Sequence, residues 1–528
     1  RTPQSARNFL FGELSSCYDP FLMKDMDRGT ARIKQAVASG EKILIYGDYD
    51  VDGVTSTALL SDIFETMGAK YETFIPNRME DGYGLNIRAV AMARDRGVKL
   101  IVTVDCGINS VEEVKCAADY GIDVVITDHH EVKSGERPPA FAIIDPHQEE
   151  CGYPFKYLAG VGVTYKIAQA LLAGTGARDY ADRHLDLVAL GTVADVVPQI
   201  DENRILTKAG LKKLRCTEKP GLNALMRVAG IDPENLTCRH IGFGMGPRIN
   251  AMGRVGSANV ALDLLMCRDA GRASEIANIL DRENRNRQDI EKDILKDVQN
   301  KINRDTRLKD QEIIVLGDEK WHPGIIGIVA SRITEEYSKP AILISFDGEM
   351  GKGSGRSVKG FNLFNAINEA NSYLVDFGGH EQACGIRIKK ENLESFRGCI
   401  NEAAKKNMPS GKIPELNIDI ELPFAHMNMN LIKEMELLMP YGPGNFEPVF
   451  STNGLKVKSA PRNIGKNGFK FFATCGNITR EAITFRKNGS IRPSAGNTIN
   501  LAYTPSINSW GGIDTIQLNI KDMQIAPQ

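Results

Sequence analysis

Short apolar runs alternate with helical stretches through about the first 215 residues, and five runs end on acidic or imidazole side chains. The runs cover residues 42–46, 100–104, 124–127, 142–144 and 187–190. Runs of this length that are rich in β-branched residues are typical of strands buried on both faces of a parallel sheet. A helical stretch over 55–64 follows the first run directly. The alternation therefore predicts βαβ units and an α/β fold.

The polar residues at the ends of these runs predict a metal site. They are Asp48, Asp50, Asp52, Asp105, Asp128, His129, His130, Asp145 and Asp195. Ligands of open α/β sheets gather outside the carboxyl ends of the strands, and carboxylates converging there repel one another unless cations lie among them. A mixed Asp/His set without Cys favours Mn²⁺ or Mg²⁺, and a pair of ions bridged by one Asp suits phosphoester hydrolysis.

Each of these motifs also has an ordinary structural interpretation. Asp48, Asp50 and Asp52 could form an acidic turn that caps the following helix, whereas Gly47 and Gly53 would let the backbone bend them toward an ion. No Glu stands at the twelfth position of this loop, which disfavours an EF-hand. A lone buried His is more often a core residue, but two adjacent His after an Asp, in a chain with eight His, favour the metal site.

The pattern changes after the first domain. Residues 270–302 form a long charged stretch whose middle, 281–289, is wholly polar, which predicts a helix that spans solvent between domains. Apolar runs at 312–316 and 341–345 flank an apolar helix near 325–333 and predict a second α/β domain. Residues 408–412 are expected to form a linker. Beyond it, a small β-barrel is predicted by apolar–polar alternation at 416–420, 455–458, 469–471 and 515–520.

Charge is balanced over the whole chain, with 65 basic and 67 acidic residues, so any contact with nucleic acid must come from local clusters. One such cluster precedes Phe471 and Phe472 and comprises Lys456, Lys458, Arg462, Lys466 and Lys470. Basic residues beside aromatic rings are typical of a groove that tracks a single strand. A solvated charged face over core aromatics is the alternative interpretation.

Two further features bear on the compartment. The ten cysteines are scattered without a Cys-x-x-Cys pair, which disfavours a disulfide framework and predicts a reducing cytoplasm. No apolar run approaches the length of a membrane span, and no signal peptide is recognisable, so no membrane association is expected. The sequence begins at Arg1 rather than Met, which indicates a trimmed or processed chain.

Motifs in order along the chain resemble a known family. The GDYDVDG of 47–53, the run ending at Asp105, the DHH of 128–130 and the GTVADVVP of 191–198 resemble the DHH phosphoesterase superfamily. Later motifs narrow the resemblance to the RecJ family of bacterial single-strand-specific 5′→3′ exonucleases, and these are GPRINAMGR at 246–254, WHPGIIGIVA at 321–330, GSGRS at 353–357 and FGGHE at 377–381. The resemblance runs from about residue 5 to the C-terminus.

The resemblance implies an order of domains. It places a parallel-sheet DHH catalytic domain at 1–215 and a helical region with a long connector helix at 216–305. A smaller α/β DHHA1 substrate-binding domain is expected at 306–408, followed by an OB-like single-strand-binding barrel at 412–528.

The resemblance also implies site residues. The metal-binding positions would be Asp50, Asp52, Asp105, His129 and Asp195, with Asp105 as the bridge. Asp48 and His130 complete the implied catalytic set, and His130 could instead contact the scissile phosphate. In small-substrate DHH enzymes a His stands four residues before the position of Asp50; here Tyr46 stands there, so the ligand set differs and Asp48 is a candidate to compensate.

Substrate contacts are expected in the second half of the chain. The implied residues are Arg248, Asn250, Arg254, Ser354, Gly355, Arg356, Ser357, Gly379 and His380. Loops around Gly353, Gly355, Gly378 and Gly379 are expected to bring backbone N–H groups close to an anion, with tight turns as the alternative. Trp321 and His322 could stack on a base or pack between domains.

The resemblance implies a metal-dependent 5′→3′ exonuclease that degrades single-stranded DNA to 5′-mononucleotides in DNA repair and recombination, using two divalent cations, Mn²⁺ or Mg²⁺. It further implies a monomer that works with a single-strand-binding protein and a RecQ-like helicase. One alternative is a DHH hydrolase of short oligonucleotides, cyclic dinucleotides or pyrophosphate, which would need neither connector helix nor barrel. Another is a non-catalytic DNA-binding replication scaffold, against which the complete acidic and imidazole set speaks.

Overall fold

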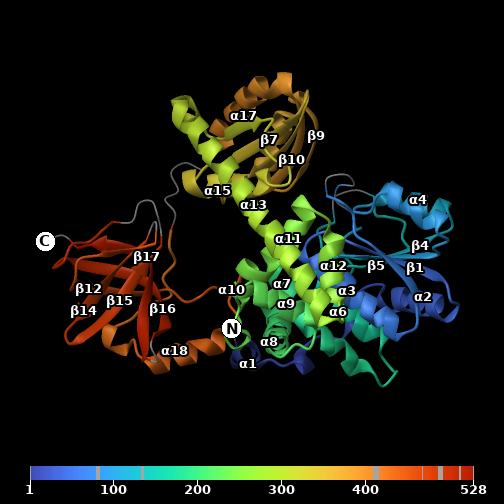
Figure 1. Ribbon diagram of the computed structural model, residues 1–528, viewed down its shortest axis with the longest axis horizontal. Helices are drawn as coiled ribbons and strands as arrows, with labels where there is room; N and C mark the ends of the chain where they lie inside the picture. Colours follow the sequence, from blue (N-terminus) through green and yellow to red (C-terminus); the bar gives the residue numbers. More distant parts are fainter. Residues whose placement is uncertain are drawn as a thin grey trace. The chain divides into compact units, whose positions relative to one another are not determined.

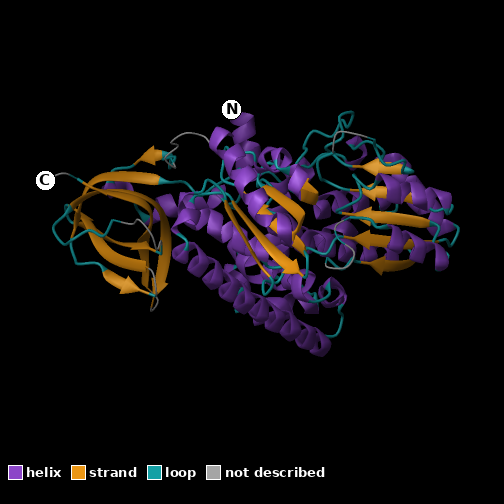
Figure 2. Cartoon of the chain, turned by 90° about the horizontal axis from the view of Figure 1, so that it is seen from above, coloured by secondary structure: helices purple, strands orange, loops and turns teal. Residues whose placement is uncertain are grey.

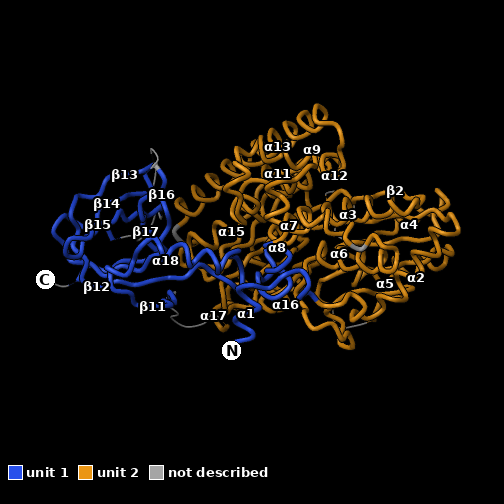
Figure 3. The backbone as a smooth tube through the Cα atoms, turned by 90° about the horizontal axis from the view of Figure 1, so that it is seen from below, with its two compact units in different colours: residues 1–17, 196–208, 413–528 blue, residues 18–195, 209–412 orange. Residues whose placement is uncertain are grey.

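A computed structural model describes residues 2–78, 82, 84–132, 136–407, 415–465, 468–485, 491–510 and 513–526. The chain forms two compact units (Figure 3). Unit 1 contains residues 1–17, 196–208 and 413–528, and unit 2 contains residues 18–195 and 209–412. The linker predicted at 408–412 and the predicted strand-binding residue Lys466 lie outside the described residues.

The first sheet of unit 2 has five parallel strands in the order β2-β1-β3-β4-β5 (Figure 1). Four predicted strands are confirmed as β1 (Lys42–Gly47), β3 (Leu100–Val104), β4 (Asp123–Thr127) and β5 (Ala142–Ile144). From β1 the chain runs to β2 (Lys70–Phe74) on one side and then crosses to β3 on the other. The carboxyl ends of β1 and β3 therefore form a topological switch point, where open α/β sheets bind their ligands.

Helices cover both faces of this sheet (Figure 2). On one face α4 (Ile87–Asp95) and α5 (Val111–Asp119) pack on Val124 and Ile126. Val125 points to the opposite face because side chains alternate along a strand, and there it lies against α2 (Met26–Ala38). On that side α3 (Val51–Thr66) packs on β1, and α6 (Gly160–Leu171) packs on β3 and β4.

The fifth predicted strand is wrong. Residues 187–190 belong to helix α7 (Leu185–Ala194), which packs between α3 and α6. All residues from Leu185 to Thr192 are buried, including Asp186, which pairs with Lys219, so the helix is buried on every side and its sequence shows no helical periodicity. A short continuous apolar run cannot be assigned by periodicity, and here the burial of all faces concealed the helix.

A helical region follows, and its longest member is the predicted connector helix. This helical region comprises α8 (Asp201–Arg215), α9 (Pro220–Val228), α10 (Cys238–His240), a π-helix (Ile241–Met245), α11 (Gly246–Val255), α12 (Ala258–Met266) and the connector helix α13 (Ala270–Arg304). In the middle of α13 one side is exposed to solvent, at residues 282, 285, 286, 288 and 289, whereas Asp281 and Asn284 on the other side are buried. Asp281 pairs with Arg248 at 2.8 Å, so polar residues are buried here through ion pairs rather than hydrated.

The second predicted α/β domain is confirmed, with a mixed sheet in the order β6-β7-β8-β10-β9. The strands are β6 (Ile314–Asp318), β7 (Ala341–Asp347), β8 (Met350–Arg356), β9 (Leu374–Gly379) and β10 (Ala383–Lys389). Only β6 and β7 pair in parallel. The helices are α14 (Thr306–Asp310), α15 (Ile326–Tyr337), α16 (Leu363–Glu369) and α17 (Leu393–Asn407). The core beneath α15 is separate from the core beneath α16 and α17.

Unit 1 contains the predicted β-barrel. Its strands are β11 (Ile420–Glu421), β12 (Phe450–Val457), β13 (Arg462–Ile464), β14 (Gly468–Cys475), β15 (Ile478–Thr484), β16 (Thr498–Trp510) and β17 (Ile513–Ile525). Pairing between β12 and β14 closes the ring β12-β16-β17-β15-β14. The strand predicted over 416–420 begins only at Ile420. Phe471 lies in the core, whereas Phe472 is 44% exposed, so only Phe472 could stack on a base.

Unit 1 also contains α1 (Pro3–Phe11) and α18 (Met429–Met435). Buried Arg204 connects the three chain segments of unit 1, because it donates hydrogen bonds to the carbonyls of Phe9 (2.8 Å), Leu437 (2.9 Å) and Leu438 (2.7 Å). The ten cysteines all lie within the described residues, and none of them forms a disulfide bond. Within the described part of the chain, every helix is too short or too polar to cross a membrane.

Candidate metal centre

The acidic cluster lies at the switch point of the first sheet. Asp48 and Asp50 follow β1, and Asp105 follows β3, so the two strand ends on either side of the crossover supply carboxylates to one place. The fold thus brings together carboxylates that lie far apart in the sequence, at the strand ends from which the site was predicted. Ligand atoms lie within 4.8 Å of one another in three groups, which are Asp48/Asp50/Asp105, Asp52/His129/Asp195 and Asp105/His129/His130.

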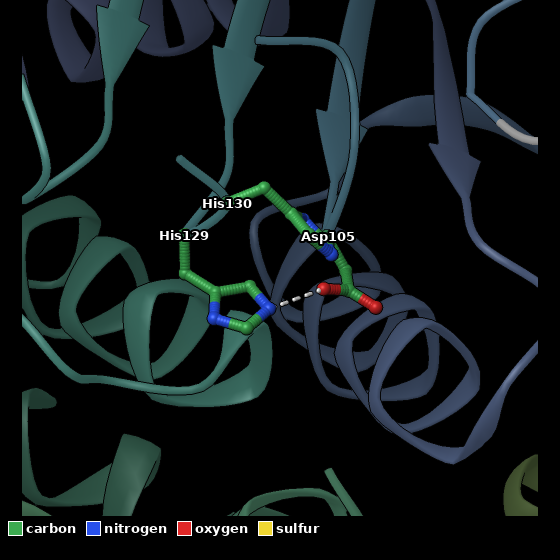
Figure 4. Close-up of side chains that lie close together, drawn as sticks. All are labelled: Asp105, His129 and His130. Atoms are coloured by element: carbon green, nitrogen blue, oxygen red, sulfur yellow. Dashed lines mark ion pairs between the residues drawn. The ribbon is translucent and has the colours of Figure 1, made fainter. Parts of the chain in front are cut away.

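His129 and Asp105 are central to this arrangement. Figure 4 shows the His129 ring directed at the Asp105 carboxylate. His129 Nε2 lies 3.1 Å from Asp105 Oδ1, 3.8 Å from Asp52 Oδ2 and 3.7 Å from Asp195 Oδ2. Asp105 belongs to two of the three groups. Asp145, which follows β5, belongs to none of them and instead accepts a hydrogen bond from the His147 N–H at 2.7 Å.

Helix ends hold two of the carboxylates. Asp50 caps α3, since its Oδ1 accepts from the N–H groups of Asp52 (2.9 Å) and Gly53 (3.1 Å). Asp50 therefore caps α3, as one interpretation of the motif predicted, and also lies in the ligand cluster. Asp52 is buried and accepts from the first two N–H groups of α6, Gly160 (2.6 Å) and Val161 (2.8 Å). The positive end of α6 stabilises a carboxylate there.

Asp105 is held in an unusual backbone conformation beside a glycine. Its φ of 63° lies in the left-handed region, which Asp adopts more readily than most side chains. Its carboxylate presses on the start of α6, because a Cβ added at Gly160 would lie 2.6 Å from Asp105 Oδ1. Gly160 therefore provides the space in which the Asp105 carboxylate sits, and the sequence motifs did not indicate this residue.

His129 is prepared to act as a ligand through Nε2. Its ring hydrogen-bonds the Leu158 carbonyl, and its Nε2 is buried without a hydrogen-bond partner among the described residues. Burial, together with neighbouring His130, lowers the pKa of His129 to about 3. A neutral imidazole that donates through one nitrogen to a carbonyl presents the lone pair of the other, which is the form that binds metals.

His130 has a different environment from its neighbour. Burial alone would lower the pKa of His130, but a 2.7 Å hydrogen bond to Asp128 and the surrounding carboxylates raise it to about 9. Buried Asp128 also accepts from the N–H groups of His129 (2.8 Å), His130 (3.2 Å) and Ile108 (2.9 Å). His130 is therefore positively charged near neutral pH, and Asp128 orients it. The motif itself could have indicated this role for Asp128.

Buried ligand atoms without partners show that a divalent cation fits. Asp48 Oδ1 has no hydrogen-bond partner among the described residues, and Asp105 Oδ1 and unprotonated His129 Nε2 face each other at 3.1 Å without a hydrogen bond, although an unpaired buried polar atom is costly. Burial, followed by repulsion from neighbouring carboxylates, raises the pKa of Asp48, Asp105 and Asp195 well above the ordinary range and that of Asp52 to about 7. Oxygen donors with one imidazole suit Mn²⁺ or Mg²⁺.

Two adjoining hollows extend from these ligands. The acid hollow, of about 290 Å³, is lined by Asp48, Asp50, Asp195, Arg78, Asn250 and Arg254. The phosphate hollow, also about 290 Å³, shares Arg78 and Arg254 and adds Lys352, Ser354 and Arg356. Burial, followed by repulsion from Arg78, lowers the pKa of Arg254 to about 10 and lowers the pKa of Lys352 and Arg356. Cations gathered in this way fit an anionic group.

Arg78 and Lys352 line these hollows although no sequence motif indicated either residue. The Arg78 guanidinium lies 5.1 Å from the centre of the Tyr49 ring, a cation–π distance that fixes it beside the GDYDVDG turn. Arg78 stands in a polar loop after β2 without a distinctive motif around it. Only the folded chain reveals its place, through its contact with the Tyr49 ring and its position beside Arg254 in both hollows.

Other implied substrate residues lie in varied surroundings. Asn250 Oδ1 accepts from the Val51 N–H at 3.3 Å, and Arg248 donates to Asp281 and to the Gly244 carbonyl (2.7 Å). Ser357 donates to the Phe361 carbonyl at 2.7 Å, and exposed His380 stands in the β9–β10 turn. Trp321 is buried and donates to Asp297 at 2.9 Å, so it packs inside the domain.

The glycine-rich segment 353–357 differs from the predicted loop. Gly353 and Gly355 lie within β8, which pairs with β7 on one edge and β10 on the other. A Cβ at Gly353 would lie 2.6 Å from Ile386, so glycine permits close packing here. Ser354 and Arg356, in alternation with these glycines, line the phosphate hollow. Gly379, with a φ of 141°, is the last residue of β9.

A pH-dependent response to Mn²⁺ follows from the raised carboxyl pKa values. Without a cation the folded state keeps protons that the unfolded state releases, so its stability falls as pH rises from the ordinary carboxyl pKa toward about 7, the pKa of Asp52. A bound cation replaces those protons. We expect Mn²⁺ at several hundred times its Kd to add roughly 3–4 kcal/mol to the free energy of unfolding.

Thermal unfolding with Mn²⁺ or with EDTA, at about pH 5 and about pH 8, measures this gain. Because Mn²⁺ and EDTA are compared at the same pH, the stability contributions of titratable groups that do not contact the cation cancel. The gain should be larger at the higher pH, and equal gains at both would contradict the assignment of these carboxylates.

Comparisons with known proteins agree with this geometry. Residues 42–192 match the N-terminal domain of the DHH family, residues 310–406 match the DHHA1 domain, and residues 418–522 match the RecJ OB domain. The chain is 38% identical to a single-stranded-DNA-specific exonuclease RecJ of Bacillus subtilis over 99% of its own length, and it spans 66% of that protein. It is 34% identical to the Escherichia coli exonuclease of the same name, covering 95% of this chain and 90% of the relative.

A solved structure has the same architecture. The crystal structure of RecJ from Thermus thermophilus in complex with Mn²⁺ superposes with a TM-score of 0.82 at 28% identity, covering 96% of this chain and 72% of that one. The match extends over the DHH sheet, the DHHA1 domain and the barrel that the sequence predicted. On the strength of these relatives, the chain belongs to the RecJ family of DHH proteins.

Proposed function

We propose that this protein is a metal-dependent exonuclease that degrades single-stranded DNA from its 5′ end to 5′-mononucleotides. One observation carries the proposal: Asp48, which has a buried oxygen without a partner among the described residues, lines the acid hollow with Asp50 and Asp195, and this hollow shares Arg78 and Arg254 with the cationic phosphate hollow. The phosphate hollow can therefore bind a second phosphate while a phosphodiester lies beside the carboxylates. The names of the Bacillus and Escherichia relatives support single-stranded DNA as the substrate.

The proposed metal ligands are Asp50, Asp52, Asp105, His129 and Asp195, with Asp48 beside them. Two divalent cations, Mn²⁺ or Mg²⁺, would supply an activated water and neutralise charge on the phosphoryl oxygens. The chain's own contribution is to hold His129 neutral, to fix Asp105 against Gly160 and to place the His130 cation at the rim of the cluster. Positively charged His130 is suited to contact the scissile phosphate.

The polarity of cleavage is assigned to the phosphate hollow. Arg78, Lys352 and Arg356 together with the Ser354 hydroxyl suit a terminal phosphate, whose charge exceeds that of a diester. A 5′-terminal phosphate held there would place the first phosphodiester in the acid hollow. Among the implied substrate residues, Asn250 and Arg254 line the acid hollow as well.

The wider setting belongs to the same proposal and rests on the family resemblance. It comprises a role in DNA repair and recombination, a single-strand-binding protein and a RecQ-like helicase as partners, a monomeric state and a cytoplasmic location. The free thiols are compatible with a reducing compartment. The four domain ranges, 1–215, 216–305, 306–408 and 412–528, are proposed on the same footing.

Digestion of end-labelled DNA tests the proposal. Single and double strands labelled at the 5′ or 3′ end would be incubated with Mn²⁺ or Mg²⁺, beside cyclic dinucleotides and pyrophosphate. We expect immediate release of the 5′ label as mononucleotide from single strands only. Preferred hydrolysis of the small substrates would favour the alternative DHH hydrolase, and binding without cleavage would favour the scaffold.

Arg356→Ala should weaken the preference for a 5′-phosphate. Loss of a charge-assisted contact of about 1.5–3 kcal/mol lowers the ratio of kcat/KM for phosphorylated over hydroxyl-ended strands roughly 10- to 100-fold. Exposed Arg307→Ala, in α14 of the same domain, is the matched control and should leave the ratio unchanged. An unaltered ratio in Arg356→Ala would remove this residue from the phosphate hollow's function.

A further inference from the structure

A third hollow adjoins the acid hollow through Asn250 and Arg254. This connector hollow, of about 500 Å³, lies among α11, α13 and α15 and is lined by Phe243, Asn250, Arg254, Arg287, Lys292 and Arg332 with other residues. It shares Arg254 with the phosphate hollow as well. Two cationic hollows, the phosphate hollow and the connector hollow, therefore adjoin the acid hollow. A terminal phosphate needs only one of these two hollows.

Buried Glu291 fixes two of the cations of the connector hollow. Its carboxylate accepts from Arg287 Nη1 at 2.7 Å and lies 2.6 Å from Arg332 Nε, so it joins α13 to α15. The Glu291 side chain is only 2% exposed, whereas Arg332 is 53% exposed. Arg254, Arg287, Lys292 and Arg332 together outweigh the one carboxylate. The wall is thus positively charged, and its guanidinium groups are pre-oriented.

An exposed aromatic ring stands at this wall. Phe243 is 82% exposed, the largest exposed fraction among the large hydrophobic side chains of the described residues. It belongs to the π-helix Ile241–Met245, a distortion often found at functional sites. Glycines flank it, and Gly244 allows the turn to approach Ile231, since a Cβ there would lie 2.9 Å from the Ile231 side chain. Packing does not explain a ring in this position.

Pre-oriented cations beside an exposed ring fit one class of ligand better than others. Single-stranded nucleic acid offers phosphates to the cations and a base face to the ring. We propose that the connector hollow holds the strand on the 3′ side of the scissile phosphate, with one base stacked on Phe243 and its phosphates paired with Arg287, Lys292 and Arg332. This inference rests on the proposed exonuclease function and extends it from the cleaved phosphate to the strand that follows.

The inference makes binding depend on strand length. A dinucleotide fills only the phosphate and acid hollows, whereas a longer strand also reaches Phe243. Stacking therefore contributes only to longer substrates, and Phe243 sets how strongly they are preferred.

Kinetics on two lengths test this dependence. The ratio of kcat/KM for a 5′-phosphorylated octanucleotide over a 5′-phosphorylated dinucleotide is compared in wild type, Phe243→Ala, Phe243→Tyr and Phe21→Ala. Phe21 is another exposed phenylalanine and serves as the matched control. Phe243→Ala should lower the ratio about tenfold, as expected for a lost base–aromatic stack, while Phe243→Tyr and Phe21→Ala keep it. A wild-type ratio in Phe243→Ala would overturn the proposal.

A binding measurement decides the matter without cleavage. Strands carrying 2-aminopurine at successive positions from the 5′ end are bound in EDTA, and a stacked base shows quenched emission. One internal position should be quenched by wild type and not by Phe243→Ala, and equal quenching by both overturns the proposal. Should wild type bind strands in this way but never cleave them, the proposed function would fail while this inference stands.

Salt dependence tests the cations separately. Arg332→Gln should reduce the slope of log Kd against log salt concentration by about 0.7 for a long strand, the value for one phosphate contact on single strands. An unchanged slope would exclude Arg332 from the track.

Discussion

Asp105→Asn should lower the kcat for single-stranded DNA by roughly three orders of magnitude, the upper end of losses seen when one charge-stabilising group is removed. Asp105 contributes to two of the three ligand groups, and its Oδ1 is a buried atom without a hydrogen-bond partner among the described residues. The amide keeps the size of the side chain but lacks the charge that a bridging ligand needs. Single-turnover cleavage of a labelled strand in Mn²⁺ measures the effect.

DNA binding distinguishes a chemical defect from a folding defect. Fluorescence anisotropy in EDTA should give the variant a Kd equal to or below that of wild type, because a negative charge near the phosphates has been removed. Asp119→Asn, on the exposed side of α5, is the matched control and should cleave normally. Cleavage by Asp105→Asn at the wild-type rate would show that another carboxylate bridges the cations.

Gly160→Ala should lower kcat about 100-fold although it changes no group that contacts the substrate. A Cβ at Gly160 would lie 2.6 Å from Asp105 Oδ1 and 2.7 Å from Asp105 Cβ, so the Asp105 carboxylate must move. A displacement of about 1 Å at a reacting centre can cost this much rate. Gly160 opens α6 without a left-handed φ, and alanine favours a helix over glycine by about 1 kcal/mol.

Gly162→Ala provides a close comparison, two residues further along α6. Its Cβ would meet Leu158 Cδ2 at 3.3 Å, and that flexible side chain can yield. Both variants should fold, as judged by circular dichroism, and only Gly160→Ala should lose activity and the Mn²⁺-dependent gain in stability. Equal activity of the two would show that Asp105 tolerates displacement, which would weaken its role as the bridge.

The two adjacent histidines of the DHH motif have different environments and therefore different properties in the folded protein. His129 is neutral and directs Nε2 at Asp105, whereas His130 is charged through Asp128. Both residues follow the same strand and stand side by side in sequence. The Leu158 carbonyl and the Asp128 carboxylate, each in contact with only one of the rings, make the difference.

The sequence by itself determined the strands whose ends carry the carboxylates and the identity of most residues gathered there. Apolar runs of β-branched residues form buried strands through local preference and hydrophobic burial, and parallel strands bring their carboxyl ends to one edge. Asp48, Asp50, Asp105 and His129 could therefore be named from the chain alone. The run at 187–190 could not be assigned, because a helix buried on all sides leaves no periodic signal.

Only the tertiary structure decided the features that depend on contacts between distant segments. Arg78 enters the hollows through packing on Tyr49, Gly160 matters because Asp105 lies against it, and Glu291 is buried because Arg287 and Arg332 pair with it. None of these residues differs locally from an ordinary loop arginine, helix glycine or helix glutamate. Their roles depend on residues that become neighbours only when the chain folds. A sequence pattern shows which residues are adjacent along the chain and not which residues meet in space.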